Sequence, residues 1–281
     1  MRVGLVQLSC SDDPAANLET TVRYVREAHA AGAQLIATPE VTNCLSLSRE
    51  RQTRVLCAQD DDPTLAGLRA LTKELSATLL IGSLALRTET PRFANRSFLI
   101  GPLGDILAQY DKIHMFDVEL GSGERYAESD GYRPGEQAVV ARLPNDGPHL
   151  GMTICYDIRF AALYRSLAQA GAQILAVPSA FTRPTGAAHW EVLLRARAIE
   201  TGCFVIAPAQ TGTHPAQPGE RQRKTWGHAL VVDPWGEVLL DMGTEPGVAC
   251  VDLDLDAVAE ARHRIPSLKH DRHFGPPEPY A

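Results

Sequence analysis

A cysteine, a glutamate and a lysine each stand where a short apolar run of the sequence ends. Cys155 follows the run Gly-Met-Thr-Ile and precedes the polar residues Tyr156 and Asp157. Glu40 follows the run 34–38 and a proline, and Lys112 follows the run 105–111. Short apolar runs bounded by polar residues predict buried strands, and open α/β proteins bind ligands at the carboxyl ends of their strands. We therefore expect Cys155, Glu40 and Lys112 at one rim of a sheet.

These residue types suit nucleophilic catalysis by a thiol. Glu40 could activate Cys155 as a general base and then protonate a departing amine. Lys112 could lower the thiol pKa and hold a developing oxyanion. Each residue also has an ordinary interpretation, since free cysteine often packs as a small hydrophobe, and glutamate and lysine are mostly exposed.

The first half of the chain predicts strands that alternate with helices. Asp12, Asp13 and Pro14 predict a helix start, and Gly32 predicts its end. A second helix is expected over 64–77, and strands are expected over 2–8, 34–38, 79–86, 92–100 and 105–111. Residues 113–135 are expected to form a long polar loop, which in a compact domain is usually functional.

The second half repeats the first. Residues 31–39 read Ala-Gly-Ala-Gln-Leu-Ile-Ala-Thr-Pro, and residues 170–178 read Ala-Gly-Ala-Gln-Ile-Leu-Ala-Val-Pro. Strands are expected over 149–155, 173–177, 203–209, 226–232, 237–240 and 248–253, and helices over 160–170, 187–200 and 254–264. The repeat predicts two similar β/α halves about a pseudo-twofold axis, in a layered α/β (α+β) architecture. We expect one domain over residues 1–281, with an extended tail from about residue 265.

Composition excludes several classes of protein. The net charge of −7 argues against a nucleic-acid or anionic-membrane partner. The six cysteines include no Cys-x-x-Cys pair, and in a chain of 281 residues we expect free thiols in a reducing compartment. No signal peptide or membrane span is predicted, so a cytoplasmic location is expected. His263, His270 and His273 lack an accompanying pattern of metal ligands, and no metal site is expected.

Three motifs in register resemble those of the nitrilase-like carbon–nitrogen hydrolases. They are Thr-Pro-Glu at Glu40, Tyr-Asp-Lys-Ile-His-Met-Phe-Asp around Lys112, and Ile-Cys-Tyr-Asp-Ile-Arg-Phe around Cys155. The resemblance runs from the first strand to about Phe274. It implies a four-layer αββα sandwich, a homodimer or higher homo-oligomer, and hydrolysis of a non-peptide C–N bond without metal or organic cofactor.

The resemblance also implies roles for individual residues. Cys155 would attack an amide carbonyl and form a thioester, with Glu40 as base and then acid. Lys112 and the backbone N–H of Tyr156 would stabilise the oxyanion. A further catalytic glutamate is expected in the polar loop, where Glu128 is the first candidate and Glu119 the competing one.

The residues around the thiol resemble the amidase branch. Nitrilases typically show Cys-Trp-Glu and carbamoylases Cys-Asn-Asp, whereas this chain has Cys-Tyr-Asp. The motifs over 178–182, 185–200 and 226–236 are similar to the branch of deaminated-glutathione amidase and ω-amidase, and closer to the former. Phe181 and Thr182 are therefore candidate substrate-binding residues.

The resemblance implies a small amide substrate that carries a carboxylate, hydrolysed with water at its terminal C–N bond and releasing ammonia. Arg159 is a candidate clamp for the carboxylate, or alternatively an ion-pair partner of Asp157 or of an acidic loop. The chain has Ala161 and Ala162 where many relatives have Pro-Glu, which leaves the next helix start and the pocket wall open. ω-Amidase, nitrilase, N-carbamoyl hydrolase and a non-catalytic scaffold on the same fold are the alternatives.

Overall fold

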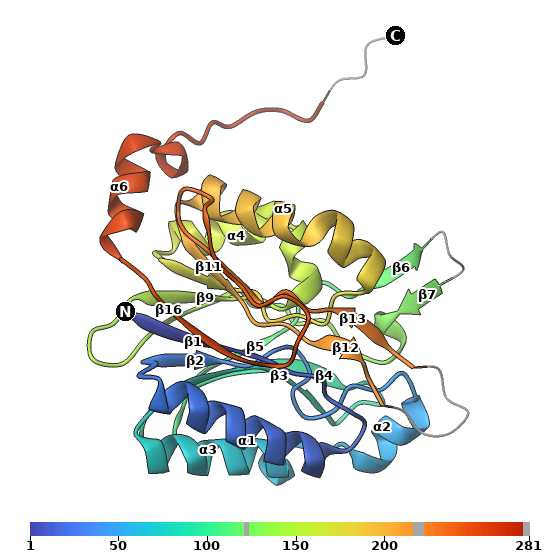
Figure 1. Ribbon diagram of the computed structural model, residues 1–281. Helices are drawn as coiled ribbons and strands as arrows, with labels where there is room; N and C mark the ends of the chain where they lie inside the picture. Colours follow the sequence, from blue (N-terminus) through green and yellow to red (C-terminus); the bar gives the residue numbers. More distant parts are fainter. Residues whose placement is uncertain (121–123, 216–221, 278–281) are drawn as a thin grey trace.

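Two six-stranded sheets lie face to face in the computed structural model, which describes residues 1–120, 124–215 and 222–277 (Figure 1). The first sheet has the order β16 (Gly247–Asp252), β1 (Arg2–Gln7), β2 (Leu35–Ala37), β3 (Thr78–Leu86), β4 (Ala94–Ile100) and β5 (Ile106–Asp111). The second has the order β15 (Val238–Asp241), β14 (Leu230–Val232), β11 (Phe204–Ala207), β10 (Ile174–Ala176), β9 (His149–Met152) and β8 (Val139–Arg142). In each sheet three parallel strands form the centre, and antiparallel strands flank them.

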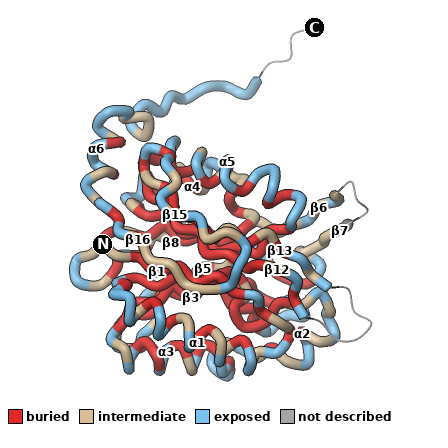
Figure 2. Tube along the Cα trace, viewed as in Figure 1, coloured by how far each residue is buried: buried red, intermediate tan, exposed pale blue. Residues whose placement is uncertain are grey.

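Helices cover the outer faces of both sheets, which makes the predicted four-layer αββα sandwich. Figure 1 shows α1 (Pro14–Ala30) and α3 (Pro63–Leu75) below the first sheet, and α4 (Ala161–Gln169) and α5 (Arg183–Thr201) above the second. Strand alternation divides the core accordingly, because successive side chains point to opposite faces. In β1, Val3 and Leu5 belong to the large cluster between the sheets, which continues to α4 and α5, whereas Val6 packs in the cluster that the first sheet forms with α1 and α3. Figure 2 shows the resulting buried interior.

The predicted helix starts agree with the structure in α1 and differ in α5. The Asp13 carboxylate accepts hydrogen bonds from the N–H groups of Ala15 and Ala16 and caps α1, with Pro14 in the first turn. Helix α5 begins at Arg183 rather than at residue 187, because Pro184 fits the first turn of a helix. Gly186 is required there, since a Cβ would lie 2.2 Å from the ring of Trp226.

Several predicted elements are corrected by the structure. The segment 113–135 is not a structureless loop, since it contains β6 (Asp117–Leu120), β7 (Glu124–Ala127) and the short helix η2 (Glu128–Asp130). The predicted strand 226–232 is two strands, β13 (Lys224–Trp226) and β14, separated by Gly227 and His228 with positive φ. The helix α2 (Arg49–Val55) and the strands β8 and β12 (Thr211–Thr213) were not predicted.

The end of the molecule that carries α2 also carries two hairpins, β6–β7 and β12–β13 (Figure 1). Residues 121–123 of the polar loop predicted over 113–135 lie outside the described residues, and so do residues 216–221. Helix α6 (Asp256–Arg264) and an exposed tail end the described chain, and residues 278–281 of the predicted tail also lie outside it. No helix within 1–120, 124–215 and 222–277 is long and apolar enough to cross a membrane.

Candidate active site

Cys155 lies in a tight turn after the central strand β9. The predicted strand 149–155 ends at Met152, and Cys155 begins the short helix η3 (Cys155–Arg159). Its φ of 49° is in the left-handed region, which ends the extended strand and costs a non-glycine residue on the order of 1–3 kcal/mol. Its N–H donates to the carbonyl of Pro178 at 2.9 Å, which ties the turn to the end of β10. The thiol is buried in the cluster between the sheets.

Glu40 follows the end of β2 and is buried beside the thiol. Its Oε2 accepts from the N–H of Ala180 at 2.8 Å, and its Oε1 accepts from Asn95 at 2.9 Å. The pKa values of Glu40 and Cys155 both reflect a hydrogen bond between their side chains. Gly82 of β3 allows the backbone before Glu40 to pass close by, because a Cβ there would lie 2.0 Å from the carbonyl oxygen of Thr38 and 2.5 Å from that of Pro39.

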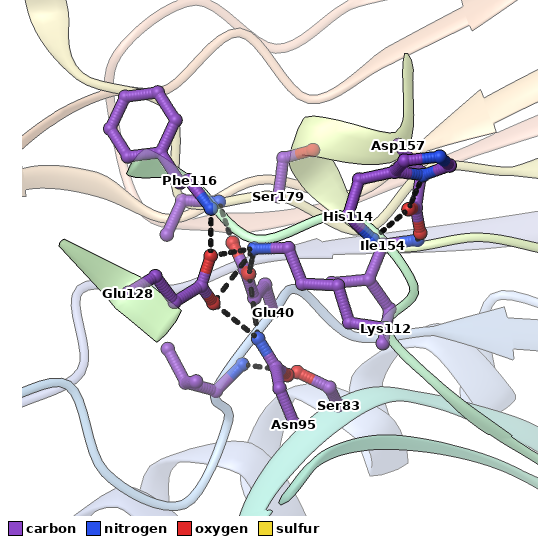
Figure 3. Close-up of polar contacts among 12 residues, drawn as sticks. Glu40, Ser83, Asn95, Lys112, His114, Phe116, Glu128, Ile154, Asp157 and Ser179 are labelled. Carbon is purple, nitrogen blue, oxygen red and sulfur yellow. Dashed lines mark hydrogen bonds and ion pairs between the residues drawn. The ribbon is translucent and has the colours of Figure 1, made fainter. Parts of the chain in front are cut away.

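Lys112 joins two carboxylates. Its Nζ lies 2.9 Å from Oε1 of Glu40 and 2.9 Å from both carboxylate oxygens of Glu128, as Figure 3 shows. Only 2% of Lys112 is exposed, so these contacts take the place of water around the ammonium group. The predicted trio of Glu40, Lys112 and Cys155 is therefore brought together.

Glu128, not Glu119, reaches this cluster. Glu128 begins η2, directly after the hairpin, and its Oε2 accepts from the N–H of Phe116 at 2.6 Å. Glu119 lies in β6 and is exposed, opposite Arg125 of β7. The hairpin thus turns Glu119 outward and returns the chain to Lys112.

The charges of the cluster set the protonation states. Burial alone would raise the pKa of Glu40, but the charge of Lys112 and hydrogen bonds from Lys112, Cys155 and Asn95 hold the pKa below its ordinary value. Burial opposes the charge of Lys112, yet Glu128 and Glu40 raise its pKa well above the usual range. Burial, with the negative charge of Glu40, raises the pKa of Cys155, and Lys112 offsets only part of this. The resting cluster therefore holds a neutral thiol beside an ionised carboxylate.

Asp157 holds the cysteine turn against the lysine segment. Its Oδ2 accepts from the hydroxyl of Tyr110 at 2.6 Å and from the N–H of Ile154 at 2.9 Å. Its Oδ1 accepts from the N–H of His114 at 3.0 Å and lies 2.7 Å from His114 Nδ1 (Figure 3). One buried carboxylate thus connects the residues on both sides of Lys112 with the residue before Cys155. The predicted alternative, an ion pair between Asp157 and Arg159, is wrong, because these contacts occupy Asp157.

A cavity of about 460 Å³ opens over the cluster, within the usual size range of ligand pockets. Seven of the eight candidate residues line it: Glu40, Lys112, Glu128, Cys155, Tyr156, Phe181 and Thr182. Arg159 is not among the lining residues, and its Nη2 lies 3.1 Å from Nδ1 of His189. Helix α4 begins at Ala161 and Ala162, but neither residue lines the cavity.

Three kinds of residue at the site were not predicted from the sequence. Asn95 donates to Glu40 and, at 3.4 Å, to Glu128. Ala180 contributes only a backbone N–H, which no side-chain pattern could indicate. Arg49 and Arg223 line the cavity, and neither was among the candidate site residues. An asparagine inside the predicted strand 92–100 was the one available signal, since amides are depleted in strands.

The described residues contain no group of three or more His, Cys, Asp and Glu side chains that could hold a metal ion. A family model described as carbon–nitrogen hydrolase matches residues 2–263. A deaminated glutathione amidase from Synechocystis is 37% identical over 94% of this chain and 96% of its own. An omega-amidase from Xenopus tropicalis is 34% identical over 97% of this chain and 95% of its own.

Solved structures agree with these sequence relatives. The NitFhit protein of Caenorhabditis elegans superposes with a TM-score of 0.87 at 32% identity over 96% of this chain, which spans 65% of that protein's length. An amidase from Nesterenkonia, in a Glu-to-Gln variant with acrylamide added at its active-site cysteine, superposes with a TM-score of 0.77 at 28% identity. It covers 94% of this chain and 98% of its own. The chain belongs to the carbon–nitrogen hydrolase family and is a hydrolase of non-peptide C–N bonds.

Proposed function

We propose that this hydrolase is an amidase that carries the acyl group of a small carboxylate-bearing amide as a thioester on Cys155. Deaminated glutathione is the first candidate substrate, and α-ketoglutaramate, the substrate of an ω-amidase, is the second. The buried contact of Glu40 with both Lys112 and the thiol carries the proposal. The name of the Synechocystis relative and the acrylamide adduct on the Nesterenkonia cysteine support it.

Acylation begins with the neutral thiol. Glu40 takes the proton of Cys155 as the sulfur attacks the amide carbonyl, because its low pKa leaves it ionised and able to accept. Negative charge then develops on the carbonyl oxygen, where Nζ of Lys112 and the N–H of Tyr156 stabilise it. Glu40 returns its proton to the nitrogen, the C–N bond breaks, and the amine leaves.

Deacylation repeats these steps with water. Glu40 takes a proton from a water molecule, which attacks the thioester carbonyl, and the same donors stabilise the second oxyanion. The C–S bond breaks, and the sulfur takes the proton back from Glu40. Glu128 keeps Lys112 protonated throughout, because the charge of its carboxylate raises the lysine pKa more than that of Glu40 does.

The Cys-Tyr-Asp context favours an amidase over the two other reactions of the family. A nitrilase would convert a nitrile, and an N-carbamoyl hydrolase would convert a ureido acid. Turnover of either substrate above that of amides would replace this proposal. A non-catalytic scaffold would need no ionised base beside a buried thiol, and it would turn over none of these compounds.

Amide hydrolysis of deaminated glutathione and α-ketoglutaramate tests the proposal. The wild-type protein should convert at least one of them, and Cys155→Ala should convert neither. Cys57→Ser is the matched control, because Cys57 is a free cysteine that does not line the cavity. Full activity of folded Cys155→Ala would contradict the mechanism, and no turnover by folded wild type would contradict the substrate class.

A homodimer and a reducing, cytoplasmic location complete the proposal. Val192 and Ile199 of α5 are 68% and 54% exposed, and Trp235 near Ile199 is 48% exposed. Exposed apolar side chains of this kind are typical of an interface. All six cysteines are free, which fits a reducing compartment. Light scattering should report twice the chain mass for the wild type and a monomer for Val192→Glu/Ile199→Glu.

A further inference from the structure

The cavity over Cys155 is cationic, although the chain as a whole carries a net charge of −7. Its lining contains four basic side chains and two carboxylates, and both carboxylates contact Lys112. The described lining therefore holds no further carboxylate that could neutralise the remaining three, Arg49, Arg125 and Arg223. A concave surface of one sign attracts a ligand of the opposite sign.

Arg223 is held rigidly beside the catalytic cluster. Its Nη2 donates to the carbonyl of Ala180 at 2.8 Å, and the N–H of Ala180 in turn donates to Glu40. The guanidinium carbon lies 4.7 Å from the ring centroid of Tyr126, and the backbone carbonyl of Arg223 accepts from the N–H of His214. In the described part of the chain it has no carboxylate partner, so donors of the guanidinium remain for a ligand.

Arg49 reaches the same cavity from the other half of the molecule. Its guanidinium carbon lies 5.4 Å from the ring centroids of both Phe93 and Tyr132, and its Nη1 donates to Gln52 at 2.9 Å. Gly131 leaves room for it, since a Cβ there would lie 1.4 Å from Arg49 Nη2. Among residues 1–120, 124–215 and 222–277 it too has no carboxylate partner. Arg49 is exposed, however, so water and salt screen its charge more than that of Arg223.

Two other arginines are less suited to hold a ligand. Arg125 is exposed and stands opposite Glu119 in the hairpin, which supplies a neighbouring carboxylate. Arg159 lies outside the cavity lining and contacts His189.

We infer that Arg223, assisted by Arg49, binds the carboxylate of the amide substrate and so selects anionic over neutral amides. This inference rests on the proposed amidase function and assigns the recognition to residues other than Arg159. A guanidinium fixed by stacking binds a carboxylate through two parallel N–H donors with little loss of side-chain freedom.

The test compares two amides that differ in one carboxylate, glutaramate and butyramide. Arg223→Gln removes charge-assisted hydrogen bonds to the carboxylate, so KM for glutaramate should rise roughly tenfold to hundredfold with kcat unchanged. Arg49→Gln should raise KM for glutaramate by up to about fivefold, because an exposed charge contributes less to binding than a partly buried one. Neither variant should change kcat/KM for butyramide by more than about twofold. Lys224→Gln and Arg54→Gln are the matched controls, since these basic residues lie next to Arg223 and on the helix of Arg49 but do not line the cavity.

The butyramide measurement separates recognition from structure. If Arg223 only supports Ala180 and Glu40, Arg223→Gln will lower kcat/KM for both amides equally, and the inference is overturned. Unchanged KM for glutaramate in Arg223→Gln overturns it as well.

A binding measurement keeps the inference separate from the proposed reaction. The proposed function fails if the wild type hydrolyses neither of its two candidate substrates. If it also hydrolyses neither glutaramate nor butyramide, calorimetry of glutarate binding to Cys155→Ala decides the anion site. Binding that weakens at least tenfold in Cys155→Ala/Arg223→Gln supports the site. Equal binding by the two proteins, or none by either, contradicts it.

Discussion

In the first half of the molecule, the segment 31–39 leads to Glu40, and in the second half the nearly identical segment 170–178 leads to Ser179. The backbone frameworks are equivalent, because β1–β2–β3 and β9–β10–β11 are both runs of parallel strands. The functional groups are not equivalent. Glu40 contacts Lys112, whereas Ser179 donates to the carbonyl of Val177 two residues earlier.

The cysteine shows the same difference between the halves. Cys155 follows β9 in a turn with positive φ, whereas Leu8, after the corresponding strand β1, is a buried apolar residue. Lys112 and Glu128 come from the segment that joins the two halves and follows β5. The repeat therefore builds a symmetric scaffold, and the chemistry depends on residues that break the symmetry.

The largest difference between the halves is expected at the two residues that follow the prolines. Glu40→Gln removes the base, so kcat should fall by roughly 10²–10⁴-fold. Ser179→Ala removes one buried hydroxyl and should leave kcat within about threefold, at a cost in stability of about 1 kcal/mol. Steady-state kinetics of both variants checks this. Comparable losses would show that the two positions share a role.

Asp157→Asn tests the contact between the cysteine turn and the lysine segment. An amide group cannot accept at its nitrogen, so one pair of hydrogen bonds to Asp157 is lost. Small displacements of reacting groups are costly, and we expect kcat to fall on the order of 10–100-fold. Asp241→Asn is the control, because Asp241 also pairs with a histidine but lies on β15, at the edge of the second sheet. A kcat equal to that of the wild type would remove Asp157 from the account.

The shared framework predicts equal effects at Gly4 and Gly151, which occupy corresponding positions in β1 and β9. A Cβ at Gly4 would lie 3.0 Å from Ala28 and Ala33, and one at Gly151 would lie 2.9 Å from Leu175. Each Gly→Ala change should destabilise the fold by about 1–3 kcal/mol, without changing kcat per folded molecule. Gly247→Ala, which meets nothing within 4 Å, is the control in urea unfolding. If only one of the two Gly→Ala changes lowered the free energy of unfolding, the two halves would not be equivalent frameworks.

The smallest expected effect is a shift in pH dependence. Because the pKa of Glu40 is lower than its ordinary value of 4.5, the base stays ionised as the pH falls, and kcat/KM should decline only below that value. Stability should depend on pH in the same direction. Ionised Glu40 stabilises the fold above the pKa that it has in the unfolded chain, and this stabilisation is lost as the pH falls through its pKa in the folded protein. Asn95→Ala removes a hydrogen bond to the carboxylate, so the acid limb should move up by about 0.5–1 pH unit. An acid limb that stays in place would show that Asn95 does not stabilise ionised Glu40.

The sequence predicted the layered fold and the partners of the thiol because strand ends and motifs are local signals. The apolar runs before Glu40 and Cys155 indicate where buried strands end, and the repeat indicates that the two ends are related. The resemblance alone favoured Glu128 over Glu119, whereas the hairpin that turns Glu119 outward depends on strand pairing that no local signal indicated. The positions of Arg159 beside His189 and of Arg223 beside Tyr126 depend on side-chain packing that the sequence does not indicate. The positive φ of Cys155 has no sequence signal, because glycine usually marks such positions and here a cysteine occupies one.

Acid quenching of the reaction, followed by peptide mass spectrometry, tests the central claim most directly. With an amide substrate, the peptide that contains Cys155 should gain the mass of the acyl group, and the other five cysteines should stay unmodified. Glu40→Gln should show no acylation on the same time scale, whereas Ser179→Ala should show it as the wild type does. Turnover without acyl transfer to Cys155, or acylation of another cysteine at the catalytic rate, would contradict the account.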